Sequence, residues 1–133
     1  MLKIEHIGIA VKSFSESVPL FQKLLNSQCY KTELIESENV NTAFFKKGET
    51  KIELLESITE DGIIQKYIDK KGEGIHHIAF EVEDIVAEMN RLESEGFILL
   101  NKKPKKGADN KMVCFLHPKS TNGVLIELCQ ERK

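Results

Sequence analysis

The pattern of apolar and polar positions repeats along the chain. When residues 4–11 are placed over residues 75–82, a shift of 71 residues that carries His6 to His77, the large apolar residues coincide: Ile4, Ile7, Ile9 and Val11 fall on Ile75, Ile78, Phe80 and Val82. Each stretch is followed by a residue suited to cap a helix, Ser13 in the first copy and Asp84 in the second, and then by spaced apolar residues. Each half therefore opens with a strand followed by a helix.

Three short β-rich runs follow each expected helix. They cover residues 29–35, 40–45 and 51–55 in the first half, and residues 97–100, 111–116 and 124–129 in the second, where 102–110 forms a polar loop. Apolar residues at helical spacing predict a linking helix over about residues 60–71. The pattern thus predicts an α+β fold in a single domain, residues 1–133, with two tandem βαβββ modules over about 1–57 and 73–131.

Composition and charge exclude several classes of protein. A chain of 133 residues suits one core, and 19 basic against 21 acidic residues leave no basic surface for nucleic acid. No apolar stretch approaches the roughly 20 residues that cross a bilayer, and the start is too short for a leader, so we expect a cytoplasmic protein without a membrane partner. Cys29, Cys114 and Cys129 are widely spaced, which predicts reduced thiols rather than disulfides.

The first strand of each half carries a candidate metal ligand. Because side chains alternate along a strand, His6, Gly8 and Ala10 share one face, and the opposite, apolar face is expected to carry the helix. The two small residues leave open volume beside the histidine, as in a concave pocket. In the second half the same register selects His77 over His76.

The last strand of each half carries a carboxylate in the same Ile-Glu-Leu context, Glu53 and Glu127. A buried carboxylate is stabilised by a cation or a hydrogen-bonded partner. One such residue in a strand is more often structural, but repetition in both halves favours a shared site of His6, Glu53, His77 and Glu127. Nitrogen and oxygen donors suit Co²⁺, Mn²⁺, Ni²⁺, Zn²⁺ or Mg²⁺.

Two polar segments are candidate substrate contacts. Lys119 and Ser120, in the turn before the last strand, either contact an anionic substrate or belong to a plain hairpin loop. The lysine-rich residues 102–106 form either a solvated loop or a site that attracts phosphates.

The motifs IEHIGIAV, KIELLE, GEGIHHIAFEV and FLHPKSTNGVLIEL together resemble the methylmalonyl-CoA epimerase family of the vicinal oxygen chelate superfamily, over nearly the whole chain. The resemblance implies that superfamily's fold, with a curved sheet around a metal site and helices on the outside. It also implies a divalent ion, often cobalt, held by His6, Glu53, His77 and Glu127, although some relatives have Gln at the position of Glu53.

The family reaction inverts the α-carbon of methylmalonyl-CoA by removing a proton from one face and returning one to the other, with the thioester enolate stabilised by the metal. Glu127 is the acid/base that the resemblance implies. Some relatives carry a second Glu where this chain has Thr42, so the second base stays open between Glu38, a metal-bound water and another residue. The resemblance further implies an acyl-CoA substrate, with its phosphates near residues 102–106, and a homodimer.

Two other functions stay open. A glyoxalase I-type lyase acting on a glutathione thiohemiacetal uses the same ligand set. A metal-free small-molecule-binding member of the superfamily would normally lack the histidines and glutamates that this chain carries.

Overall fold

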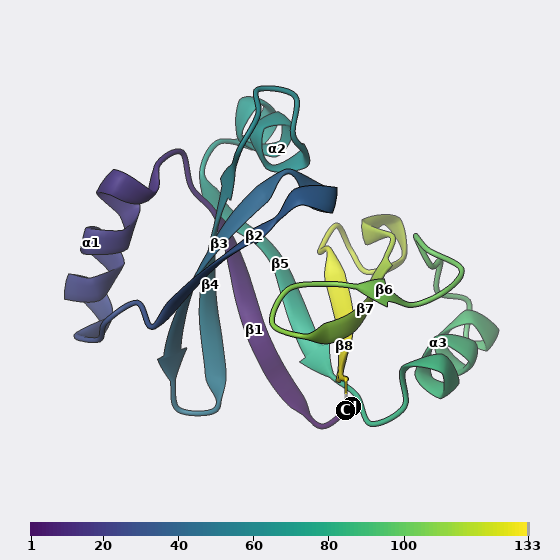
Figure 1. Ribbon diagram of the computed structural model, residues 1–133. Coiled ribbons are helices and arrows are strands. Elements are labelled where there is room, and N and C mark those ends of the chain that lie inside the picture. Colours follow the sequence, from purple (N-terminus) through teal and green to yellow (C-terminus); the bar gives the residue numbers. More distant parts are fainter. Residues whose placement is uncertain (133) are drawn as a thin grey trace. The chain divides into compact units, whose positions relative to one another are not determined.

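The computed structural model describes residues 1–132, in which the order of one strand, one helix and three strands occurs twice (Figure 1). The first series, with the helix that follows it, consists of β1 (Lys3–Ala10), α1 (Phe14–Leu25), β2 (Lys31–Ile35), the 3-10 turn η1 (Glu36–Glu38), β3 (Val40–Lys47), β4 (Thr50–Ser57) and α2 (Ile63–Lys71). The second consists of β5 (Gly74–Glu81), α3 (Ile85–Ser94), β6 (Lys105–Lys106), β7 (Lys111–Leu116), the 3-10 turn η2 (Pro118–Ser120) and β8 (Ile126–Glu131). The predicted α+β fold of two βαβββ modules is confirmed.

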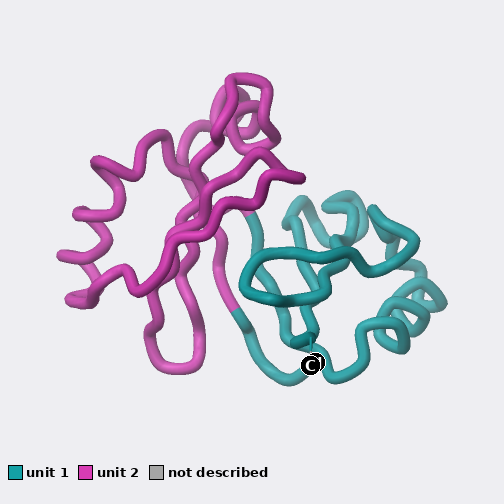
Figure 2. The backbone as a smooth tube through the Cα atoms, in the orientation of Figure 1, with its two compact units in different colours: residues 1–5, 77–133 teal, residues 6–76 magenta. Residues whose placement is uncertain are grey.

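The chain divides into two compact units (Figure 2). One unit comprises residues 6–76, and the other comprises residues 1–5 together with the chain from residue 77 onward. Strand β1 therefore begins in one unit and continues in the other.

In the unit of residues 6–76 the strands lie in the order β2-β3-β4-β1. β1 runs parallel to β4, and both β4 and β2 run antiparallel to β3. The register places Gly8 beside Glu53 and Phe44 opposite Glu53. Paired residues point to the same face, so the small residue and the aromatic ring both flank the carboxylate.

Helix α1 packs against the face of this sheet that is opposite Glu53. Its partly buried apolar residues recur at helical spacing and form one stripe: Phe14, Val18, Phe21 and Leu25. They pack against Ile9, Val11, Ala43, Phe45, Ile52 and Leu54. The expectation that the Ile9 face of the first strand carries the helix is therefore confirmed.

Helix α2 covers part of the other face, which the sequence predicted to be open. Ile64 and Ile68 lie one helical turn apart and pack against Ala10 in a cluster with Val40 and Leu55. The expectation of open volume is therefore wrong at Ala10, because the linking helix fills that end of the face.

In the other unit the strands lie in the order β5-β8-β7-β6, with β5 parallel to β8 and the other pairs antiparallel. Helix α3 begins after Asp84, whose carboxylate accepts a hydrogen bond from the Ala87 N–H at 3.1 Å, the cap that the sequence predicted. The apolar residues of α3 lie in a cluster with residues of β7 and β8: Ile85, Met89, Leu92, Cys114, Leu116 and Leu128. The helix thus lies on the face opposite Glu127.

The expected strand over residues 97–100 is wrong, since only Leu99 forms a bridge there, with Leu116. The side-chain oxygen Oδ1 of Asn101 accepts a hydrogen bond from the Phe115 N–H at 3.0 Å. This side-chain hydrogen bond replaces the backbone hydrogen bond that would have continued the ladder. The expected loop over 102–110 instead contains β6, which pairs with Met112 and Val113.

Two strands begin later than predicted, β2 at Lys31 and β8 at Ile126. The N–H of Val124 donates to the Thr121 carbonyl, so this residue belongs to the preceding turn. Among residues 1–132, every helix is too short or too polar to cross a membrane.

Candidate metal centre

His6 and Glu53 form a close, buried pair. The Nδ1 atom of His6 on β1 lies 3.1 Å from Oε2 of Glu53 on β4, and their side chains are 7% and 4% exposed. Gly8, the partner of Glu53 in the β1–β4 register, adds no side chain beside the carboxylate. A buried histidine thus lies against a buried carboxylate, and Gly8 leaves space beside that carboxylate because it has no side chain.

His77 and Glu127 form an equivalent pair in the other unit. Nε2 of His77 on β5 lies 3.1 Å from Oε1 of Glu127 on β8, and the side chains are 6% and 7% exposed. Ala79 takes the place that Gly8 has in the first pair, since it is the register partner of Glu127. The edge of the Phe115 ring meets His77 at a centroid distance of 5.8 Å and an interplanar angle of 83°.

The structure therefore joins the four predicted ligands as two pairs, His6 with Glu53 and His77 with Glu127. Imidazole nitrogen and carboxylate oxygen are ligands for Co²⁺, Mn²⁺, Ni²⁺ and Zn²⁺, and burial removes competing water. A buried carboxylate is costly without a cation or donor nearby. The donor set of each pair therefore fits one half of a divalent metal site.

A lysine covers the aromatic ring next to each carboxylate, which the sequence analysis missed. Lys31 Nζ lies 4.6 Å from the centroid of Phe44, the partner of Glu53. Lys105 Nζ lies 5.7 Å from the centroid of Phe115, the partner of Glu127. Because the contacts join different strands, alternation within one strand could not reveal them.

Glu5 is a second feature that the sequence analysis missed. It directly precedes His6, yet only 2% of it is exposed, which breaks the alternation of buried and exposed residues along β1. Burial raises the pKa of the Cys129 thiol well above its ordinary value, and the Glu127 and Glu5 carboxylates raise it further. Cys129 is thus a neutral thiol on the face of Glu127.

Two residues bear on the identity of the second base: Thr42, which has no carboxylate, and Glu38, which was one of the options. Thr42 is 1% exposed on β3, where it is paired with Leu55. Glu38 lies in η1, at the turn between β2 and β3, and is half-buried.

The turn with Lys119 and Ser120 is held by its own polar groups. The Ser120 hydroxyl donates to the His117 carbonyl at 2.9 Å and accepts the Ile98 N–H at 3.3 Å. The Lys119 N–H donates to Nδ1 of His117 at 3.0 Å, while the Lys119 side chain is exposed. Ser120 therefore shapes this turn, and Lys119 presents its ammonium group to solvent.

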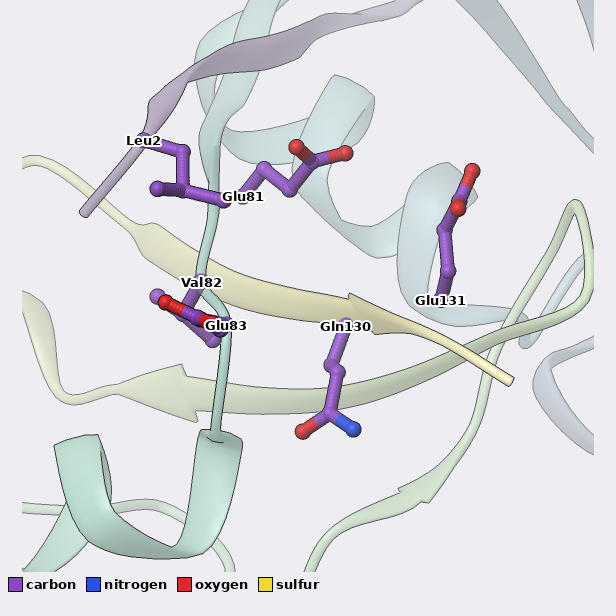
Figure 3. Close-up of a pocket in the computed structure, with 6 residues that line it drawn as sticks. All are labelled: Leu2, Glu81, Val82, Glu83, Gln130 and Glu131. Carbon is purple, nitrogen blue, oxygen red and sulfur yellow. The ribbon is translucent and has the colours of Figure 1, made fainter. Parts of the chain in front are cut away.

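A cavity of about 310 Å³ lies near the ends of β5 and β8 (Figure 3). It is lined by Leu2, Glu81, Val82, Glu83, Gln130 and Glu131. The carboxylates of Glu81 and Glu131 point to one side and the Gln130 amide to the other, where its Oε1 accepts the Ile85 N–H at 2.7 Å. The lining contains none of the residues that the sequence predicted for the site.

Comparison with known proteins defines the class. The family model described as the Glyoxalase/Bleomycin resistance protein/Dioxygenase superfamily matches residues 5–115. The Ethylmalonyl-CoA/methylmalonyl-CoA epimerase of Cereibacter sphaeroides is 37% identical over 130 residues, which are 96% of this chain and 97% of that protein. The mitochondrial methylmalonyl-CoA epimerase of Homo sapiens is 34% identical over 129 residues, 96% of this chain and 73% of that protein.

A solved structure agrees. A variant of the Streptomyces coelicolor methylmalonyl-CoA epimerase, in complex with 2-nitronate-propionyl-CoA, superposes with a TM-score of 0.95 at 32% identity, covering 100% of this chain and 99% of that one. The chain belongs to the Glyoxalase/Bleomycin resistance protein/Dioxygenase superfamily and, within it, to the methylmalonyl-CoA epimerase family. The family resemblance inferred from the sequence motifs is confirmed.

Proposed function

We propose that the chain is a metal-dependent epimerase that interconverts the two epimers of methylmalonyl-CoA by removing and returning a proton at the α-carbon. The observation that carries the proposal is the repeated, buried histidine–glutamate pair, His6 with Glu53 and His77 with Glu127. The names of the family relatives support methylmalonyl-CoA as the substrate. The ligand named for the Streptomyces coelicolor structure supports a CoA thioester.

We propose further that His6, Glu53, His77 and Glu127 hold one divalent ion. In this proposal residues 1–133 act as one domain, and the modules of about 1–57 and 73–131 each supply one pair. The identical donors and the matching register beside Gly8 and Ala79 support a shared site. Co²⁺ is the ion expected first from the family resemblance, and Mn²⁺, Ni²⁺, Zn²⁺ and Mg²⁺ are alternatives for the same donors.

When bound, the ion supplies positive charge opposite the negative charge that develops on the thioester oxygen. The chain's own residues supply proton transfer and substrate binding. We propose that the Glu127 carboxylate accepts or returns the α-proton on one face of the carbon. The exposed Lys119 ammonium suits contact with the substrate's carboxylate, and Ser120 shapes the turn that presents it.

The exposed lysines of residues 102–106 are proposed to meet the CoA phosphates, because clustered ammonium groups attract polyanions. We also propose a homodimer in the cytoplasm. The compartment is supported by the free thiols of Cys29, Cys114 and Cys129. Analytical ultracentrifugation tests the dimer, for which twice the chain mass of 15.1 kDa is expected.

Proton exchange in deuterium oxide tests the epimerase proposal. Metal-replete protein is incubated with one epimer of methylmalonyl-CoA, and α-carbon label is followed by mass spectrometry. We expect deuterium at the α-carbon together with the opposite epimer, and the absence of label would contradict the proposal. Activity on methylglyoxal and glutathione without action on the thioester would favour the lyase. Unchanged acyl-CoA binding by His77→Ala, with no metal bound by the wild type, would favour a metal-free binder.

A further inference from the structure

Inversion at a carbon atom requires a proton-transfer group on each face, and Glu127 accounts for one of them. The strand that carries a second Glu in some relatives has Thr42 here, which has no carboxylate. We propose that Glu33 on β2 is the second catalytic acid/base of this chain. The assignment rests on the proposed epimerase function.

The sheet register places Glu33 on the same face as Glu53. Glu33 is paired with Thr42 across the β2–β3 ladder, and Thr42 is paired with Leu55 across the β3–β4 ladder. Residues opposed in antiparallel strands share a face, as do alternate residues of one strand such as Glu53 and Leu55. Glu33 is therefore the next residue across the sheet from Thr42, on the face that carries the candidate ligands.

Lys31 and Phe44 position the Glu33 carboxylate. Lys31 Nζ lies 3.7 Å from Oε1 of Glu33 and 4.6 Å from the centroid of Phe44. The Phe44 ring is fully buried beside Glu53, so it gives the lysine a fixed support. The ammonium group attracts the Glu33 carboxylate and fixes its place on this face of the sheet. The Glu33 side chain is 34% exposed, so its proton can exchange with water between turnovers.

The packing of the same face disfavours Glu38. Glu38 lies in η1, beyond the paired residues Ile35 and Val40 that end the β2–β3 ladder. Ile35 and Val40 pack in the apolar cluster under α2, which includes Ile64 and Ile68. This cluster lies along the face between η1 and Glu53, whereas Glu33 is on the Glu53 side of the Ile35–Val40 pair.

The proton balance needs no further reactant. With one epimer, the α-carbon–hydrogen bond breaks, its proton goes to the Glu33 carboxylate, and the electron pair is delocalised into the thioester carbonyl. The acid/base group on the other face then gives a proton to the carbon, so that one proton is removed and one is returned. The opposite epimer uses the two groups in reversed roles, and each carboxyl group returns to its starting state by proton exchange with water.

The test compares Glu33→Gln with the matched control Glu38→Gln, both loaded with Co²⁺, and starts separately from each epimer in deuterium oxide. We expect Glu33→Gln to lower inversion at least about 100-fold. In Glu33→Gln the remaining base should still exchange the α-proton of one epimer for deuterium without inverting the carbon. The α-proton of the other epimer should not exchange. Glu38→Gln should invert and exchange as the wild type does, and Co²⁺ affinity should be unchanged in both variants, because neither residue is a ligand.

Wild-type inversion by Glu33→Gln would overturn the assignment. If Glu33→Gln lost deuterium exchange with both epimers while its Co²⁺ affinity stayed unchanged, the assignment would also be overturned. A group that transfers protons on one face only should leave exchange on the other face intact when it is removed. Glu33→Asp keeps the carboxyl group and should invert faster than Glu33→Gln, and equal rates for the two would count against Glu33. A wild-type protein that does not epimerise would instead overturn the proposed function, and this assignment with it.

Discussion

Phe44 lies directly opposite Glu53 across the β3–β4 ladder, and its side chain is fully buried. Phe115 lies opposite Glu127 in the same way across the β7–β8 ladder, with its side chain half-buried. Each candidate carboxylate ligand thus has an aromatic ring beside it that keeps water away. Electrostatic interactions of the carboxylates are stronger in such surroundings than in bulk water.

Replacing these rings should affect the two units unequally. Phe44→Leu leaves a void at a fully buried site and removes the support of Lys31, so we expect the free energy of unfolding to fall by about 1–3 kcal/mol. Phe115→Leu should cost less, because Phe115 is only half-buried. Urea unfolding of the metal-free variants measures both, and equal losses would contradict the assigned burial.

The two adjacent histidines of β5 provide a matched test of the ligand assignment. His77→Ala removes a proposed ligand and should weaken Co²⁺ binding at least about 100-fold. His76→Ala should leave the affinity unchanged, because the His76 ring packs edge-on against Tyr67 of α2 at 4.9 Å. Isothermal titration with Co²⁺ measures both, and equal affinities would exclude His77 as a ligand.

The packing of α2 can be tested by two substitutions within its first six residues. Ile68→Ala opens a void in the apolar cluster over Ala10 and should lower the free energy of unfolding by about 2–5 kcal/mol. Ile63→Ala, at a residue that is 58% exposed, should change it by less than about 1 kcal/mol. Similar losses from both variants would mean that α2 does not cover the sheet as described.

Cys114 should make stability depend on pH in the alkaline range. Burial raises the pKa of its thiol above the ordinary value of 9.0, so above about pH 9 the unfolded chain loses a proton that the folded chain keeps. This contribution is complete below the unfolded-state pKa and declines as the pH rises toward the folded-state pKa. The difference in free energy of unfolding between wild type and Cys114→Ala should therefore shrink from about pH 8 to about pH 10. A constant or growing difference would contradict this account.

The sequence was sufficient to predict features that depend on periodicity within one segment. The repeat around His6 and His77, the helix stripes and the strand at 111–116 all follow from local spacing. The same alternation predicted a strand at 97–100, where the residues do alternate between half-buried and exposed. The ladder ends there because the Phe115 N–H donates to the Asn101 side chain instead of to a backbone carbonyl. These two residues are far apart in the sequence, so the local spacing of apolar residues does not predict their contact.

Relationships between strands could not be predicted in the same way. Alternation assigns residues to faces of one strand, but the register of β2 on β3 decides that Glu33 lies opposite Thr42. The placement of Lys31 over Phe44 also depends on this register. For the same reason the sequence offered Glu38, near the start of the strand that carries Thr42, as one candidate for the second base, and it did not single out Glu33 on the neighbouring strand.

The most direct test of the central claim is the metal content of the purified protein, combined with epimerisation of methylmalonyl-CoA before chelation, after chelation and after addition of Co²⁺. We predict one divalent ion per chain, loss of epimerisation when the ion is removed, and recovery with Co²⁺. Epimerisation that survives complete removal of metal would contradict the assignment of His6, Glu53, His77 and Glu127 as one metal site.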